Sequence, residues 1–226
     1  MSDTKFEYIS NDPDYRHLTD RDRFKALYDE VGTVEANLQV KWREEWMSRF
    51  SPKANATILE LGAHNGPNLI HYARLGHHVT GVEISDTLKA TFERHARAEP
   101  TEVQKRMVWV SGWIEEFQPR RKYDYVLLTE VLEHVADPLP IIQKSAECVT
   151  NNGIIYITSP STHWGNNTHV RGVPPLELEN WLEIAGLTPI YNIDVGGRTF
   201  CEAKLKHPAK ESLWKKIRGF WRHRGR

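Results

Sequence analysis

The fold of this chain is decided between Ile58 and Ser85, where the sequence reads ILELGAHNGPNLIHYARLGHHVTGVEIS. A short apolar run predicts a strand, and the residues after Pro67 carry apolar side chains at helical spacing. A second short strand then leads to the isolated acid Glu83. A strand, a glycine turn, a helix and a second strand form one unit of an open, mainly parallel sheet. In such sheets, ligands bind beyond the carboxyl ends of the strands.

The same alternation continues along the chain. Strands are expected in seven short runs: Ile58 to Leu61, His78 to Val82, Met107 to Val110, Tyr123 to Leu128, Ile154 to Thr158, Ile190 to Val195 and Phe200 to Leu205. Helices are expected between most of them: Pro67 to Arg74, Asp86 to Ala98, Pro138 to Thr150 and Leu176 to Ala185, with Asn152-Gly153 and Gly186 where helices should stop. Only Gly196 to Thr199 separates the last two strands, which predicts an antiparallel hairpin. The sequence therefore predicts an α/β fold with helices on both faces of the sheet.

Size and composition favour one domain with appendages. A chain of 226 residues with 39% hydrophobic residues can bury one substantial core. The first residues, MSDTKFEYIS, lack the basic start and apolar run of a secretory signal, and no stretch approaches the roughly 18 uncharged apolar residues of a membrane span. We therefore expect a cytoplasmic protein in which the widely separated Cys148 and Cys201 are reduced and buried.

The formal net charge of zero hides a basic tail. Residues 204–226 hold nine Lys or Arg against Glu211 alone, a net charge of +8, which leaves −8 for the rest of the chain. Five apolar residues form a stripe on a helix expected there: Leu213, Trp214, Ile217, Phe220 and Trp221. Such a helix fits an anionic membrane surface, and hence a peripheral membrane location. Two alternatives stay open: nucleic acid, which is less favoured, and packing of the stripe on the body.

The region from Arg21 to Phe50 predicts one or two helices. Its apolar residues lie nearly four apart on one stripe: Val34, Leu38, Trp42, Trp46 and Phe50. The stripe either packs against the sheet domain or forms a mobile cover over the mouth of an active site.

The glycine turn distinguishes between two classes of cofactor. A dinucleotide fingerprint requires G-x-G-x-x-G, whereas Gly62 to Pro67 reads GAHNGP, and Pro67 is the first residue of the expected helix. Glu83, after the second strand, can accept hydrogen bonds from both hydroxyls of a ribose. The pattern therefore favours a nucleoside cofactor other than NAD, and an NAD-dependent oxidoreductase stays as the less favoured alternative.

The segment Glu60-Leu61-Gly62-Ala63-His64-Asn65-Gly66 resembles the E/D-x-G-x-G-x-G loop of the class I S-adenosylmethionine-dependent methyltransferases. His64 stands where that family has its middle glycine. The resemblance extends over Thr57 to Leu205 in the family's order of elements. It implies S-adenosylmethionine as the cofactor and a Rossmann-like sheet of seven strands, mainly parallel, with an antiparallel last strand. The expected organisation is a helical cap over 1–50, a methyltransferase domain over 51–206 and a basic amphipathic tail over 207–226.

The third strand ends in Val110-Ser111-Gly112-Trp113. Members of the family usually have an aspartate where Trp113 stands, and it binds the adenine amino group. A tryptophan can stack on a purine or cover it, but it cannot accept that hydrogen bond. The resemblance therefore assigns the adenine edge to backbone groups near Trp113 and Ile114, and core packing is the alternative for Trp113. The predicted cofactor contacts are Glu60, Gly62, Ala63, His64, Gly66, Glu83, Ile84, Trp113, Ile114 and Glu130.

Chemistry is expected after the fourth strand, in Thr129-Glu130-Val131-Leu132-Glu133-His134-Val135. If the chain turns helical after Thr129, the side chains of Glu130, Glu133 and His134 point to one side, toward the cofactor. The segment EVLEHV resembles the corresponding part of ubiquinone-biosynthesis O-methyltransferases. Some members with this pattern bind a divalent metal, completed by a ligand from a later loop. Here that loop offers His163 and His169.

Two chemistries stay open for this cluster. A Mg²⁺, Mn²⁺ or Zn²⁺ ion on Glu130, Glu133 and His134 would polarise a substrate hydroxyl. Without a metal, His134 or His169 would take the hydroxyl proton. The predicted catalytic residues are His134, Glu133 and His169. The expected reaction is O-methylation of a small-molecule, sugar or lipid-linked hydroxyl, and a catalytically inactive adaptor of the same fold is the alternative.

Overall fold

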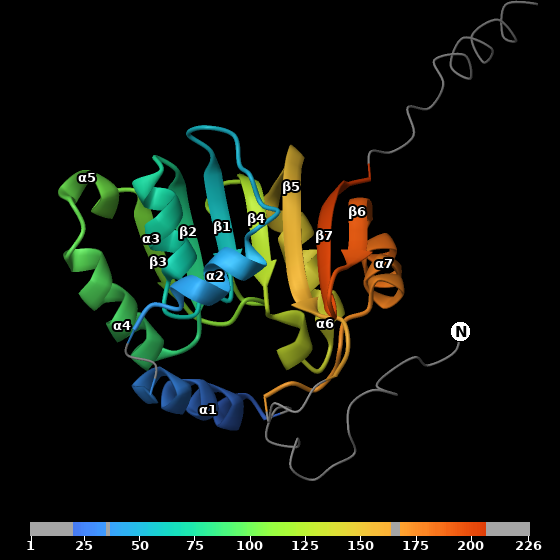
Figure 1. The fold of residues 1–226 in the computed structure, drawn as a ribbon, viewed down its shortest axis with the longest axis horizontal. Coiled ribbons are helices and arrows are strands. Elements are labelled where there is room, and N and C mark those ends of the chain that lie inside the picture. The colour runs from blue at the N-terminus through green and yellow to red at the C-terminus, as the bar shows by residue number, and fades with distance from the viewer. Residues whose placement is uncertain (1–19, 35–36, 164–167, 207–226) are drawn as a thin grey trace, which may run out of the picture.

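The computed structural model describes residues 20–34, 37–163 and 168–206 (Figure 1). Its centre is a seven-stranded sheet in the order β3-β2-β1-β4-β5-β7-β6. The strands are β1 (Thr57–Leu61), β2 (His78–Glu83), β3 (Met107–Ser111), β4 (Tyr123–Thr129), β5 (Val149–Pro160), β6 (Leu187–Asp194) and β7 (Arg198–Leu205). Neighbours among β1 to β5 pair in parallel, and β7 is antiparallel to both β5 and β6. This confirms the predicted fold class.

Helices cover both faces of the sheet (Figure 1). They are α1 (Arg21–Val34), α2 (Val40–Trp46), α3 (Pro67–Arg74), α4 (Asp86–Arg97), α5 (Thr101–Gln104), the 3₁₀ turn η2 (Leu132–His134), α6 (Pro138–Cys148) and α7 (Pro175–Ile184). Local sequence fixes where several of them begin. Ser85 caps α4 by accepting from Leu88 N, and Asp137 caps α6 by accepting from Leu139 N. Gly186, at φ 73°, follows α7 in the left-handed conformation that ends helices.

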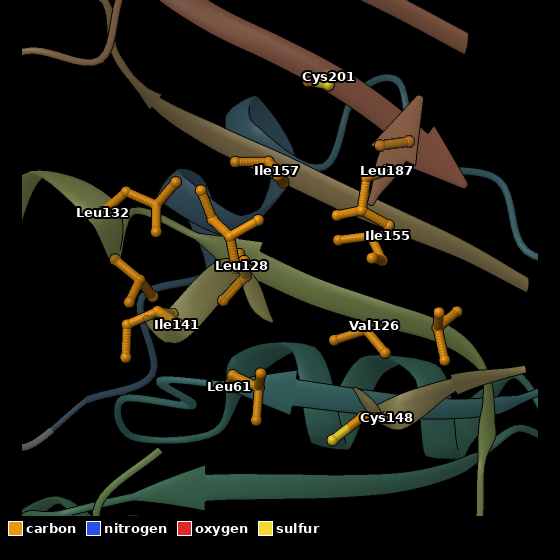
Figure 2. Close-up of a cluster of buried hydrophobic side chains, with 14 of the residues drawn as sticks. Leu61, Val126, Leu128, Leu132, Ile141, Cys148, Ile155, Ile157, Leu187 and Cys201 are labelled. Atoms are coloured by element: carbon orange, nitrogen blue, oxygen red, sulfur yellow. The ribbon is translucent and has the colours of Figure 1, made fainter. Parts of the chain in front are cut away.

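The core consists of two apolar layers, one on each face of the sheet. Alternate residues of a strand point to opposite faces, so Leu61, Val126 and Ile157 belong to one layer (Figure 2). Ile58 and Tyr156 belong to the other layer. Cys148 and Cys201 are unpaired thiols in the first layer, as predicted.

Several expected boundaries are wrong. The predicted helix stop at Asn152-Gly153 lies inside β5, which begins at Val149. A register shift in the pairing of β4 with β5 accommodates these extra residues. The short helix α5 was not predicted. The stripe from Val34 to Phe50 is broken because Leu38 lies in the connection between α1 and α2.

The tail 207–226 lies outside the described residues, as does the start of the predicted cap. Among the helices of the described part, none has the length and apolarity needed to cross a membrane.

Candidate active site

The glycine loop and the turn after β4 meet at the carboxyl edge of the sheet. They follow β1 and β4, which are neighbours at the point where the strand order reverses. Gly62 makes this approach close: a Cβ at this position would lie 2.6 Å from Cγ2 of Val131. Both Gly62 and Gly66 have φ 81°, a conformation that favours glycine. The two segments predicted to carry the cofactor and the chemistry are therefore in contact.

His64 takes the left-handed backbone conformation of the glycine it replaces, with φ 49°. Histidine is among the residues that adopt this region more often than most. The backbone N–H of His64 donates to Oε2 of Glu83 over 2.9 Å. The loop therefore keeps its course without its middle glycine.

Glu83 fastens the glycine loop to the start of α4. Its Oε1 accepts from the backbone N–H groups of Ile84 (2.8 Å) and Ser85 (3.1 Å), and its Oε2 from His64. The residue is 6% exposed, and burial raises the pKa of its carboxyl group. The structure thus brings together His64, Glu83 and Ile84, three of the predicted cofactor contacts.

Glu60 lies beneath the same loop. Its Oε1 accepts from Asn68 Nδ2 (2.6 Å) and Thr129 Oγ1 (3.1 Å), while no hydrogen-bond donor among the described residues reaches its buried Oε2. Burial raises the pKa of Glu60 to about 7. An unsatisfied buried oxygen is costly, so this position is suited to an incoming donor.

Trp113 packs on α1 rather than in either core layer. The Arg21 guanidinium lies 4.2 Å from the centre of its ring, and the Phe24 ring lies 5.8 Å away. Ile114, the next residue, packs against the core. The indole therefore stands at the end of β3, between the sheet and the N-terminal helix.

After Thr129 the chain does not form an α-helix, the condition under which Glu130, Glu133 and His134 would share one side. Glu130 adopts a left-handed conformation, φ 56°, and only the 3₁₀ turn η2 follows before Asp137 and Pro138 begin α6. The carboxylate of Glu130 forms a close ion pair with Arg198 at the start of β7. Arg198 was not predicted as a site residue, because its partner lies 68 positions earlier in the chain.

Glu133, His134 and His169 come together, as the predicted catalytic set requires. One possible ligand atom from each lies within 4.8 Å of the other two. The loop is held there by a hydrogen bond from Val170 N to Glu133 O (2.8 Å). Of the expected metal ligands, Glu133 and His134 lie together with His169, the ligand offered by the later loop, while Glu130 pairs with Arg198. His163 is exposed, and its Nε2 donates to the His169 carbonyl over 2.9 Å.

The tautomer of His134 follows from its partner. Its Nδ1 lies 3.0 Å from the Thr168 carbonyl oxygen, which can only accept, so Nδ1 carries the proton. The Nε2 lone pair then points toward Oε1 of Glu133, 3.9 Å away. Burial lowers the pKa of His134 to about 4, so the ring is neutral at pH 7.

Glu133 is fully buried. Ser159 Oγ donates to its Oε2 over 2.7 Å, whereas no N–H or hydroxyl of the described residues reaches its Oε1. Burial raises the pKa of Glu133, and burial together with the charge of Glu133 raises that of Glu130. Oε1 of Glu133 and Nε2 of His134 therefore form a pair of buried proton acceptors 3.9 Å apart.

Comparison with known proteins agrees with this geometry. Residues 34–192 match the family described as Methyltransferase domain. The chain belongs to this family. Its Rossmann-like sheet is that of a class I S-adenosylmethionine-dependent methyltransferase, as the glycine loop predicted.

Relatives and solved structures point the same way. The ubiquinone biosynthesis O-methyltransferase of Hydrogenovibrio crunogenus is 25% identical over 180 residues, 71% of this chain and 74% of that protein. The one of Nitrosomonas europaea is 30% identical over 169 residues, 66% of this chain and 70% of that protein. A Burkholderia thailandensis 1,6-didemethyltoxoflavin-N1-methyltransferase, solved with S-adenosylhomocysteine, shares the fold with a TM-score of 0.62. It is 17% identical over 84% of this chain and 88% of that one.

Proposed function

We propose that this methyltransferase moves the methyl group of S-adenosylmethionine to a hydroxyl of a small-molecule, sugar or lipid-linked acceptor. The observation that carries the proposal is the buried pair of acceptor atoms, Glu133 Oε1 and His134 Nε2, 3.9 Å apart. Both atoms belong to the turn after β4, which contacts the glycine loop through Val131 and Gly62. An acceptor hydroxyl within reach of both atoms could pass its single proton to one of them, and the other atom then stays available as a second acceptor.

The donor side fits the cofactor. Oε2 of Glu83 accepts from the backbone N–H of His64 alone and so retains one acceptor site, which a ribose hydroxyl can use, whereas Oε1 already accepts from two backbone N–H groups. The unsatisfied Oε2 of Glu60 fits the ammonium group of the methionine part. Trp113, two residues after β3, has the Arg21 guanidinium over one face of its ring, so a purine would stack on the other face. When bound, the cofactor supplies a methyl group already activated by a positively charged sulfur.

The acceptor side handles the proton. The Thr168 carbonyl binds Nδ1 of His134, which leaves Nε2 as an acceptor that can orient the acceptor hydroxyl. Glu133, with a raised pKa, is the stronger base of the two near neutral pH. The hydrogen bond from Ser159 Oγ to Oε2 of Glu133 restrains the carboxylate and hence the position of Oε1. Alignment and proton removal are the main contributions that such a displacement needs from the protein.

A metal-assisted version uses the same side chains. Glu133, His134 and His169 could hold an ion, and a carbonyl partner on the second ring nitrogen of His134 is common for metal-bound imidazoles. Two nitrogens and one oxygen suit Zn²⁺ or Mn²⁺ better than Mg²⁺. Such an ion would polarise the acceptor hydroxyl. The rate after chelation and dialysis separates the two versions: an unchanged rate supports the base, and a loss restored by Zn²⁺ or Mn²⁺ supports the metal.

Calorimetric titration with S-adenosylmethionine, S-adenosylhomocysteine and NAD tests the donor. Binding of the first two and not of NAD is expected. Binding of NAD alone would establish the oxidoreductase, and binding of none would favour the inactive adaptor. Transfer of a radioactive methyl group to a catechol, a monophenol and a simple sugar, each with its O-methylated counterpart as a blocked control, then tests the hydroxyl chemistry. Labelling of the blocked compounds to the same extent would contradict O-methylation.

The basic tail 207–226 supports a second part of the proposal, that the enzyme associates with anionic membranes. Its apolar stripe and its cations are typical of a helix that lies in a membrane interface. A lipid-linked acceptor would then be presented at the same surface.

A further inference from the structure

The N-terminal helix α1 lies along the carboxyl edge of the sheet, below α4 (Figure 1). Asp29 anchors it there. Its Oδ1 accepts from Ser85 Oγ (2.8 Å) and Asp86 N (2.9 Å), and its carbonyl accepts from Thr87 Oγ1 (2.6 Å). These contacts join α1 to the N-terminus of α4, immediately after the cofactor residue Glu83. A carboxylate at this end of a helix is also favoured by the helix dipole.

Two aromatic side chains of α1 face the site from one turn apart. Phe24 lies 5.8 Å from Trp113, and Tyr28 lies 5.8 Å from His134 in an edge-to-face arrangement, both measured between ring centres. Phe24 and Tyr28 also contact each other, with ring centres 4.8 Å apart. One helical turn advances about 5.4 Å. The helix therefore contacts both the adenine end and the acceptor end of the proposed site.

The phenol of Tyr28 is influenced by an acid from each half of the proposed site. Glu83 and Glu133 both act on it electrostatically, and burial and these charges keep the pKa of its phenol well above its ordinary value. The phenol is therefore neutral in the working range and does not act as a base. What Tyr28 offers is a rigid ring, packed edge-to-face on the imidazole of His134.

The imidazole of His134 has two further contacts, both with the segment around Thr168. Its Nδ1 is bound to the Thr168 carbonyl, and the His169 ring packs at 4.6 Å between centres. Both partners belong to the loop after β5. Tyr28 adds a contact from α1 to the same ring, on a different element from the loop after β5.

We propose that Tyr28 is a positioning residue of the methyl-transfer site, whose ring holds His134 in the orientation that serves the acceptor. The inference rests on the proposed function. It gives α1 a role in the reaction beyond covering the sheet, and it divides that role along the helix. Phe24 serves cofactor binding, and Tyr28 serves turnover.

The first measurement needs no acceptor. The ¹⁵N signals of the His134 ring, assigned by their loss in His134→Gln, report its tautomer and order. In the full chain with S-adenosylhomocysteine bound, Tyr28→Leu should shift or broaden these signals, and Tyr28→Phe should leave them near those of the wild type. Unchanged signals in Tyr28→Leu would overturn the proposal. So would equal disturbance by Phe, because Phe keeps the ring.

Turnover with an acceptor labelled in the transfer assay provides the second measurement. Tyr28→Leu should lower kcat at least tenfold while the affinity for S-adenosylhomocysteine stays within threefold, and Tyr28→Phe should restore kcat to within threefold. Phe24→Leu, one turn away on the same face, is the matched control and should raise the KM for S-adenosylmethionine with little effect on kcat. A kcat for Tyr28→Leu within twofold of the wild type would overturn the proposal. Failure of the wild type to bind S-adenosylhomocysteine would instead refute the proposed function.

Discussion

The two halves of the site are built in different ways. On the donor side, Glu83 is held by three backbone N–H groups, and the loop around it is fixed by left-handed residues such as His64. On the acceptor side, Glu130 and Glu133 are buried side chains with oxygens that no donor among the described residues satisfies. Backbone conformation and backbone hydrogen bonds thus shape the donor half, whereas the protonation of buried carboxyl groups governs the acceptor half. Substitutions in the donor half should therefore change affinity, and substitutions in the acceptor half should change turnover.

The largest effect is expected from the acceptor half. Replacing Glu133 and His134 together by alanine removes both proton acceptors, so kcat should fall by about 10³-fold or more, within the range of general-base contributions. The affinity for S-adenosylhomocysteine should change less than threefold. Initial-rate assays and calorimetry measure the two quantities. His78→Ala, exposed at the opposite edge of the sheet, is the control, and full activity of the double variant would make the cluster structural.

The next effect belongs to the donor half. Glu83→Ala should weaken binding of S-adenosylmethionine more than tenfold, because the ribose loses its acceptor and the glycine loop loses its attachment. At saturating cofactor, kcat should stay within a few fold of the wild type. Calorimetry checks the affinity, with the exposed Glu102→Ala as the comparison. Unchanged affinity would remove Glu83 from the cofactor site.

The pH dependence should distinguish the halves again. A base acts when deprotonated, and burial raises the pKa of Glu133, so kcat/KM should rise with pH at values above those of an ordinary carboxyl group. His134 does not limit this rise, because its pKa is lowered and the ring is already neutral. Ser159→Ala removes a hydrogen bond that lowers the pKa of Glu133, so the profile should move about one pH unit higher. A profile that stays in place would contradict Glu133 as the base.

The smallest effect on chemistry is expected from the tail. A chain ending at Lys206 should keep kcat for a water-soluble acceptor within twofold, since the residues assigned to both halves of the site precede residue 207. It should be lost from vesicles that contain anionic lipid, which sedimentation measures, and vesicles of neutral lipid provide the control. Equal sedimentation of both chains would end the membrane proposal.

Sequence predicted the donor half better than the acceptor half, for physical reasons. Pro67, Ser85 and Gly186 act on the backbone next to them, so α3 began as expected and α7 ended as expected. The turn after β4 depends on distant partners. Glu130 is paired with Arg198, which no local spacing indicates. Only a single 3₁₀ turn lies between β4 and α6, so the helical arrangement considered for Glu130, Glu133 and His134 does not form.

The contacts that α1 makes with the site also could not be predicted from the sequence. Its helical character follows from local pattern, but the approach of Phe24 to Trp113 and of Tyr28 to His134 joins residues about ninety or more positions apart. The sequence leaves two alternatives open for the N-terminal region: packing against the sheet domain, or a mobile cover over the mouth of an active site. The described part of α1 packs on α4 while contacting the site, so it combines features of each.

The two buried thiols have a practical consequence. Cys148 and Cys201 are both 0% exposed, and burial raises their pKa values to about 11 and 12, so neither offers a thiolate to reagents in the folded protein. Both side chains lie in the same apolar layer, Cys148 at the end of α6 and Cys201 in β7 (Figure 2). A reagent can reach them only after this layer has opened. The rate of thiol labelling therefore measures how often the core opens. A molecule that binds the folded state lowers the rate of labelling, so acceptors can be screened before any turnover has been observed.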